Sequence, residues 1–146
     1  MTILVINGPN LNMLGQREPD IYGATTLQEI ETSVKEYADR MGMTVNFFQS
    51  NVEGSIIDFI QENGSTTSGI IINAGALTHT SIALRDCLTA VMAPVIEVHI
   101  SNIYAREEFR HVSLLAPVVK GQITGLGWEG YLLAMDYLLS EANRGG

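Results

Sequence analysis

The chain has 146 residues, of which 46% are hydrophobic and 16% are charged, and its formal net charge is -8. This length suits a single catalytic domain over residues 1–146, and the apolar fraction excludes a disordered chain. The acidic balance argues against nucleic-acid binding, and no apolar run approaches the roughly 20 residues that a membrane span needs.

The single cysteine, Cys87, allows no disulfide within the chain, which suits a reducing compartment. It lies among apolar neighbours and is interpreted as a buried core thiol. The apolar N-terminus lacks the basic region and cleavage site of a secretory signal, so it is interpreted as a strand. We therefore expect a cytoplasmic protein.

Apolar strands alternate with amphipathic helices along the first half of the chain. Thr26 and Glu29 are placed as a capping box for the first helix. In chain order, the pattern predicts a strand at 3–6, a helix at 25–41, a strand at 44–49 and a helix at 53–62.

The second half continues the alternation. It predicts a strand at 69–73, a helix from Thr78 or Thr80 to about Val91, a strand at 95–100, one helical turn at 106–110, a strand at 118–124 and a helix at 128–142. Continuous apolar strands separated by helices are typical of a parallel sheet covered on both faces. Five such units predict a flavodoxin-like, doubly wound α/β/α sandwich, in which ligands bind beyond the carboxyl ends of the strands.

A long loop at 7–23 follows the first strand. Connections of this length are usually lids or binding loops, or are disordered. The loop carries a guanidinium, Arg17, and a phenol, Tyr22, five residues apart. The alternative is a solvated Arg17 and a Tyr22 that packs on the next helix. The loop has no glycine pattern of a phosphate-binding or dinucleotide-binding loop.

Asn73 ends the third strand, and the small residues after it let the backbone approach a ligand closely. The polar run 78–81 then meets a helix start, where free N–H groups favour anions. Alternatively, the hydroxyls only cap the helix and His79 is a surface residue. Asp86 is seven residues further on and is expected on the same helical face as His79; taken alone, it would be a solvated acid.

The fourth strand carries the strongest chemical signal. Alternation places Glu97, His99 and Ser101 on one face, opposite Ile100 and the other apolar residues. A buried carboxylate beside an imidazole is costly unless the two pair or serve chemistry. Glu97 can hold one tautomer of His99 and stabilise its protonated ring. The alternatives are a satisfied core pair, or a metal site that includes His79, for which no ligand spacing is present.

Downstream of this strand, Arg110 can direct a guanidinium at a carboxylate, whereas His111 is expected at the surface. Trp128 and Tyr131 are interpreted as packing or subunit contacts. The two lysines, at 35 and 120, lie outside the cluster, which argues against Schiff-base catalysis.

The strand ends therefore combine a phenol, imidazoles, guanidiniums and amides, without a cysteine nucleophile or a Gly-x-Ser-x-Gly elbow. A phenol, with its usual pKa near ~10, becomes a base only beside a cation such as Arg17. An imidazolium held by Glu97 can protonate a leaving hydroxyl. This inventory favours elimination of water next to a carbonyl. A flavodoxin-like small-ligand binding module is the alternative, but it would need phosphate-binding hydroxyls or an acidic cluster after the first strand.

Several segments, in this order along the chain, resemble type II 3-dehydroquinate dehydratases. They are NGPNLNMLGQREPDIYG at 7–23, INAGALTHTS at 72–81, IEVHISN at 96–102, AREEFRHVS at 105–113 and GQITGLGWEGYLLA at 121–134. The resemblance covers essentially the whole chain, and departures such as Met13, where Leu is expected, concern packing.

The resemblance implies anti elimination of water from 3-dehydroquinate through an enolate to give 3-dehydroshikimate, without metal or cofactor. Tyr22 resembles the base, Arg17 the lid cation that stabilises its phenolate, and His99 the acid, oriented by Glu97. Asn10 resembles the residue that positions a water or the enolate oxygen. The same reaction serves the shikimate pathway of aromatic amino acid biosynthesis or quinate breakdown.

The resemblance also implies how an anionic substrate is bound. Asp86 resembles an acid that reaches a neighbouring subunit's site, because the family forms homododecamers built as four trimers. No nucleic-acid or membrane partner is implied. The residues that resemble the remaining substrate contacts are Asn73, His79, Ile100, Ser101 and Arg110.

Overall fold

The computed structural model describes residues 1–16 and 19–145. Within them, five strands form one parallel sheet in the order β2-β1-β3-β4-β5. The strands are β1 (Thr2–Asn7), β2 (Thr44–Gln49), β3 (Gly69–Asn73), β4 (Val95–His99) and β5 (Gly121–Thr124). This order is that of flavodoxin-like folds, so the predicted fold class is confirmed.

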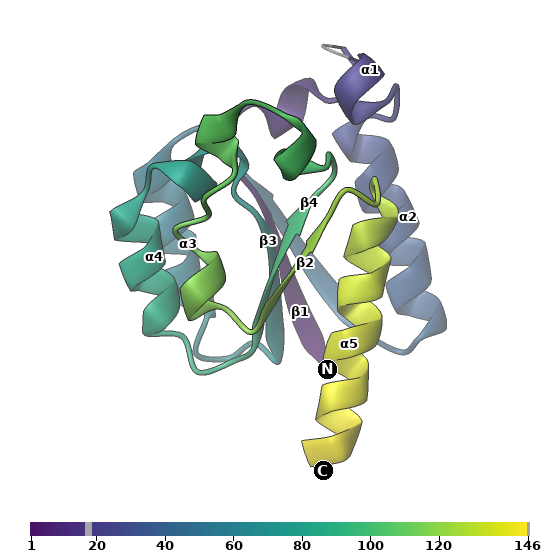
Figure 1. The fold of residues 1–146 in the computed structure, drawn as a ribbon. Helices are drawn as coiled ribbons and strands as arrows, with labels where there is room; N and C mark the ends of the chain where they lie inside the picture. Colours follow the sequence, from purple (N-terminus) through teal and green to yellow (C-terminus); the bar gives the residue numbers. More distant parts are fainter. Residues whose placement is uncertain (17–18, 146) are drawn as a thin grey trace.

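Helices cover both faces of the sheet. Two of them, α2 and α5, lie on one face, and α3 and α4 lie on the other, while α1 lies at the carboxyl end of the sheet near the start of α2 (Figure 1). Their bounds are α1 (Pro19–Tyr22), α2 (Leu27–Arg40), α3 (Glu53–Asn63), α4 (Ile82–Thr89) and α5 (Glu129–Gly145). The short 3-10 helices are η1 (Leu11–Met13), η2 (Gly75–His79), η3 (Ile103–Ala105), η4 (Glu108–Arg110) and η5 (Ala116–Val118).

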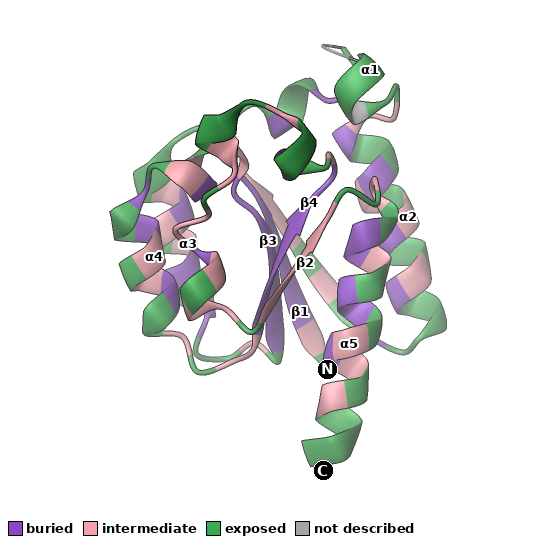
Figure 2. Cartoon of the chain, viewed as in Figure 1, coloured by how far each residue is buried: buried purple, intermediate pink, exposed green. Residues whose placement is uncertain are grey.

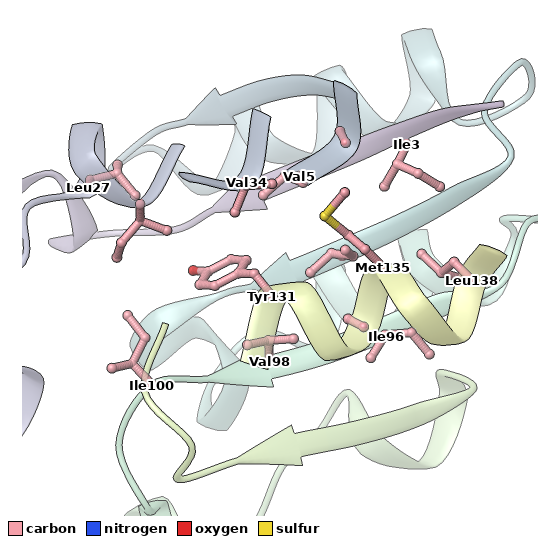
Figure 3. Close-up of a cluster of buried hydrophobic side chains, with 14 of the residues drawn as sticks. Ile3, Val5, Leu27, Val34, Ile96, Val98, Ile100, Tyr131, Met135 and Leu138 are labelled. Atoms are coloured by element: carbon pink, nitrogen blue, oxygen red, sulfur yellow. The ribbon is translucent and has the colours of Figure 1, made fainter. Parts of the chain in front are cut away.

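The core has two layers because alternate residues of each central strand point to opposite faces. Ile3 and Val5 pack with α2 and α5, and Leu4 and Ile6 pack with α3 and α4. The central strands β1, β3 and β4 are almost entirely buried (Figure 2). Tyr131 belongs to the first layer and is fully buried (Figure 3), which agrees with its predicted packing role.

Local signals set several helix starts. The Thr26 hydroxyl accepts the Glu29 backbone N–H at 3.1 Å, so the N-cap half of the predicted capping box is present. The Glu29 carboxylate accepts the Thr26 hydroxyl, whereas in a complete capping box it accepts the Thr26 backbone N–H. At α4, the Ser81 hydroxyl accepts the Leu84 backbone N–H at 2.9 Å.

None of the helices within residues 1–16 and 19–145 has both the length and the apolar character that crossing a bilayer requires.

Several predicted boundaries are wrong. The helix α2 begins two residues later than expected, and α5 ends three residues later than expected. The helix expected from Thr78 is two elements, because η2 ends at His79 and α4 begins after its Ser81 cap. His79 and Asp86 therefore do not share a helical face. The strand expected from Val118 begins at Gly121, because the preceding residues form η5, and the turn at 106–110 is helical only over η4.

Close packing joins the loops that follow β1 and β3. The Gly8 backbone N–H donates to the Asn73 carbonyl at 2.8 Å, and a Cβ on Gly8 would lie 2.4 Å from the Ala74 carbonyl oxygen. Gly75 has a φ of 60°, and a Cβ there would lie 2.9 Å from the Pro9 carbonyl oxygen. Glycine is thus required at both positions, and it fixes the two loops against each other at one edge of the sheet.

Candidate active site

A cavity opens at the carboxyl ends of β1, β3 and β4, where the doubly wound architecture places ligand sites. Its wall also includes apolar groups such as Leu11, Leu14 and Ile103. Seven of the predicted site residues line it: Asn10, Asn73, His79, His99, Ile100, Ser101 and Arg110.

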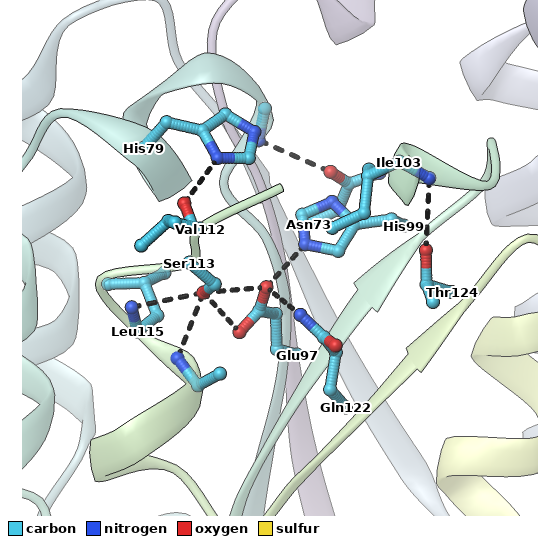
Figure 4. A network of polar contacts seen from close by, with 12 residues as sticks. Asn73, His79, Glu97, His99, Ile103, Val112, Ser113, Leu115, Gln122 and Thr124 are labelled. Atoms are coloured by element: carbon cyan, nitrogen blue, oxygen red, sulfur yellow. Dashed lines mark hydrogen bonds and ion pairs between the residues drawn. The ribbon is translucent and has the colours of Figure 1, made fainter. Parts of the chain in front are cut away.

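Glu97 lies behind the cavity wall, fully buried, and its carboxylate contacts Nε2 of His99. Ser113 Oγ lies 2.9 and 3.0 Å from the two carboxylate oxygens, and Gln122 Nε2 donates to Oε2 at 2.8 Å (Figure 4). Burial opposes ionisation of Glu97, but the hydrogen bonds from His99, Gln122 and Ser113 outweigh it and hold the carboxyl pKa below its usual range. The predicted pairing of Glu97 with His99 on one face of β4 is therefore confirmed.

The two cavity histidines have different free nitrogens. Because His99 Nε2 contacts Glu97, its Nδ1 is the nitrogen left for a ligand in the cavity that the ring lines. His79 Nδ1 donates to the Val112 carbonyl at 2.8 Å, since a carbonyl can only accept, so His79 Nε2 is left as an acceptor when the ring is neutral. The rings stack with 6.4 Å between centroids.

Two guanidiniums give the cavity its positive character. Arg110 donates from Nε to Glu107 at 2.8 Å, and this hydrogen bond lowers the Glu107 pKa. Arg106 donates from Nη1 to Ser101 Oγ at 3.4 Å. Among the described residues, no Asp or Glu side chain lines the cavity. Glu107, outside the lining, pairs with both guanidiniums, at 2.8 Å from Arg110 and 4.0 Å from Arg106, so two positive charges face one carboxylate and the cavity is locally cationic within an acidic chain. Sequence reasoning missed Arg106, and the only available signal was its position four residues before Arg110.

Amide side chains form the cavity floor. Asn73 Nδ2 donates to the Tyr131 hydroxyl at 3.2 Å, and Asn73 Oδ1 accepts the Gly75 N–H at 3.2 Å. The Tyr131 hydroxyl in turn donates to Asn7 Oδ1. Burial raises the Tyr131 pKa, so this hydroxyl keeps its proton at neutral pH. Asn7, which sequence reasoning also missed, pairs with Asn73 in the β1–β3 register.

The remaining predicted site residues lie elsewhere. Asp86 is exposed on α4 and does not line the cavity. Arg17 lies outside the described residues, and so does the side chain of Tyr22. The backbone around Tyr22 reaches the site nevertheless, because its neighbours Ile21 and Gly23 line a second hollow that shares Ile100 and Ser101 with the cavity.

His111 and the alternative metal site are the remaining interpretations that involve histidines. His111 is half-buried and donates from Nε2 to the Arg106 carbonyl at 3.0 Å, so it supports the backbone beside the cavity. In the described part of the chain, no group of three or more His, Cys, Asp or Glu side chains could hold a metal ion. The absence of a metal or cofactor in the reaction stays a prediction.

The family model described as "Dehydroquinase class II" matches residues 1–139. The chain belongs to the class II dehydroquinase family. The resemblance of its loop and strand-end motifs to this family is thereby confirmed.

Class II dehydroquinases of known sequence and structure are similar over nearly the whole chain. The 3-dehydroquinate dehydratase of Roseiflexus castenholzii is 58% identical over 145 residues, which are 99% of this chain and 92% of that protein. The 3-dehydroquinate dehydratase of Bacillus subtilis is 55% identical over 94% of this chain and 93% of that protein. The crystal structure of type II dehydroquinase from Butyrivibrio crossotus superposes with a TM-score of 0.93 at 52% identity, covering 94% of this chain and 97% of the other.

Proposed function

We propose that this class II dehydroquinase eliminates water from 3-dehydroquinate to give 3-dehydroshikimate. The observation that carries the proposal is the buried Glu97–His99 pair, which directs Nδ1 of His99 into a cationic cavity. A cationic wall suits a carboxylate-bearing substrate, and a braced imidazole suits transfer of a proton to a leaving hydroxyl. The relatives named 3-dehydroquinate dehydratase support the choice of substrate.

In the proposed mechanism, Tyr22 removes a proton next to the substrate carbonyl, and Arg17 stabilises the tyrosine as phenolate. The resulting enolate is held by Asn10 directly or through a water. The position of α1 at the rim supports this role, because Ile21 and Gly23 lie in the hollow that adjoins the cavity. His99 then protonates the departing hydroxyl, so that one proton leaves as part of water and the carbon–carbon double bond forms.

Binding of the substrate is assigned to the other polar groups of the wall. Arg110 and His79 contact its oxygens, as do Asn73, Ser101 and the backbone at Ile100. Asp86, exposed on α4, is assigned to the site of a neighbouring subunit in a dodecamer of four trimers. The elimination needs neither metal nor imine, and we place the enzyme in the cytoplasm.

Direct turnover tests the proposal. Purified protein is mixed with 3-dehydroquinate, and the absorbance of the conjugated enone product is followed. His99→Asn and Tyr22→Phe should each lower kcat by roughly 10²–10⁴-fold, the usual contribution of a positioned acid or base. A wild-type protein without turnover refutes the activity, and a fully active Tyr22→Phe variant removes Tyr22 as the base.

Two further experiments test the chemistry and the pathway. Borohydride added with substrate should leave activity intact, because both Lys35 and Lys120 lie outside the cavity lining; covalent trapping on either lysine contradicts the enolate route. We place the reaction in the shikimate pathway. The gene should therefore restore growth of a dehydratase-deficient bacterium on medium without aromatic amino acids, and rescue confined to growth on quinate would favour the catabolic role.

A further inference from the structure

We propose that Ser113 and Gln122 are positioning residues, which fix the direction of every hydrogen bond around Glu97 so that its carboxylate keeps the proton of His99 on Nε2. This inference rests on the proposed function, because it explains how His99 presents Nδ1 to the substrate.

The Ser113 hydroxyl has one possible direction. Its oxygen accepts the backbone N–H groups of Leu115 at 3.1 Å and Ala116 at 2.9 Å. These two hydrogen bonds occupy both lone pairs, so the hydroxyl can act toward Glu97 only as a donor. Its single hydrogen is shared between carboxylate oxygens at 2.9 and 3.0 Å.

The Gln122 amide has one consistent orientation. An ionised carboxylate can only accept, so the NH₂ group faces Glu97 at 2.8 Å, and the amide oxygen at the other end accepts the Tyr104 hydroxyl at 3.2 Å. The β4–β5 register places Glu97 directly beside Gln122, so the contact is built into the sheet. The reversed amide would set its oxygen against a carboxylate oxygen.

Glu97 is therefore surrounded by donors. A proton on its carboxyl could not be directed at the Ser113 hydroxyl or the Gln122 NH₂ group, because both already donate to it. Among the described residues that contact the carboxylate, this leaves His99 as the partner with which Glu97 can share a proton, so the carboxylate is held as an acceptor for Nε2–H. Since Ser113 and Gln122 are neutral, they satisfy the carboxylate without cancelling the charge that stabilises an imidazolium.

Charged or titratable groups of the described residues face this pair from two sides. The His79 ring stacked on His99 and the Arg106 and Arg110 side chains lie on the cavity side, and the Tyr104 phenol reaches Gln122 from outside the cavity lining. The two guanidiniums thus lie on the cavity side of the His99 ring, whereas the negative charge of Glu97 lies behind it.

Substitutions can separate hydrogen-bond direction from packing. Gln122→Met removes the donor, while Gln122→Glu keeps the shape but sets a second carboxylate against Glu97. Ser113→Ala removes the other donor. Matched controls are Gln28→Met on the exposed surface of α2, and Ser81→Ala, which removes a buried hydroxyl that caps α4 without touching Glu97.

Steady-state kinetics across pH give the first readout. Gln122→Met and Ser113→Ala should lower kcat about tenfold or more, a part of the roughly 10²–10⁴ of a positioned acid, while KM changes by less than about threefold. The acid limb of the pH profile of kcat should move to higher pH in both variants, because Glu97 loses hydrogen-bond donors that keep its carboxylate ionised. Gln122→Glu should lower kcat more than Gln122→Met does. The control variants should keep the wild-type kcat and pH profile. A Gln122→Glu enzyme as active as the wild type overturns the inference.

Imidazole ¹⁵N chemical shifts give a second readout that does not need turnover. Unliganded wild-type protein should show His99 with hydrogen on Nε2, and the variants should show a mixture of tautomers. If the wild type fails to convert 3-dehydroquinate, the proposed function fails, and the ring signals alone decide this inference. Unchanged tautomer populations in the double variant Ser113→Ala/Gln122→Met contradict it.

Discussion

Tyr131→Phe is the sharpest test of the amide floor beneath the cavity. The substitution removes one oxygen atom from a fully buried ring and leaves its packing in place. That oxygen donates to Asn7 and accepts from Asn73 at 3.2 Å. Both asparagines are buried, with exposed fractions of 0% and 4%. Water therefore cannot replace the lost partner of Asn7 without entering the core.

The expected loss follows from the two groups left behind. A buried polar group without its partner costs about 1–3 kcal/mol. Within the described residues, Asn7 Nδ2 already has no hydrogen-bond partner. The substitution would therefore also remove the hydrogen bond that the Asn7 side chain makes through Oδ1. Asn73 keeps one hydrogen bond, at its Oδ1, to the Gly75 N–H. Allowing for partial re-pairing of the two neighbouring amides, we expect Tyr131→Phe to lower the free energy of unfolding by roughly 2–4 kcal/mol.

Urea unfolding at neutral pH and fixed protomer concentration measures this loss, because the m-value should be unchanged. Tyr37→Phe is the matched control, since its hydroxyl donates to Asp136 at the exposed surface of the protein. We expect that control to stay within about 0.5–1 kcal/mol of the wild type. Equal losses in the two variants would refute the reasoning, because they would show that the buried amides do not depend on the Tyr131 hydroxyl. A rise in KM should accompany the loss, because Asn73 lines the cavity.

Three further substitutions test other parts of the site. Native contacts hold the Glu97 pKa below its usual ~4.3, so their stabilisation is complete above that pH and is lost as the pH falls through the native pKa. Urea unfolding across pH gives the difference in free energy of unfolding between Glu97→Gln and the wild type. This difference should be largest near neutrality and shrink below about pH 4; a difference that stays constant across pH contradicts the prediction. Gly8→Ala should cost about 1–3 kcal/mol and lower turnover, because its Cβ would meet the Ala74 carbonyl, whereas Gly54→Ala, with open space around it in α3, should not destabilise. Asn10 has a φ of 72°, so Asn10→Ala should cost about 1 kcal/mol and Asn10→Gly much less; if the amide serves the reaction, both variants should lose activity.

The fold could be predicted because its central strands are buried on both faces. Residues 69–73 and 44–49 form strands with the predicted bounds, and the helix at 53–62 differs from α3 by one residue. Continuous apolar runs such as GIIIN are typical of buried parallel strands, and the alternation with helices then restricts the topology. The Glu97–His99 pair was predictable for the same reason, since polar residues in such a strand need a partner.

The errors arise where distant segments decide the local structure. The break between η2 and α4 lies beside Thr78, whose carbonyl accepts the Leu114 N–H from a segment over thirty positions away. The late start of β5 follows a turn in which the Ser113 hydroxyl oxygen accepts hydrogen bonds from the backbone N–H groups of Leu115 and Ala116. Asn7 and Gln122 escaped notice because an amide at a strand end or edge has no periodic signature, and its role depends on the neighbour that the sheet register supplies.

The position of Glu97 reconciles two requirements that conflict in an anion-binding site. An acid catalyst needs a negative charge near its imidazolium, but a carboxylate in the cavity wall would repel an anionic substrate. Here the carboxylate is fully buried behind His99, and Arg106 and Arg110 lie on the wall itself. The ring therefore separates the two charges, and His99 can be stabilised from behind while its Nδ1 faces a cationic cavity. Such a carboxylate depends on neutral donors, because a buried cation beside it would cancel the charge that His99 uses.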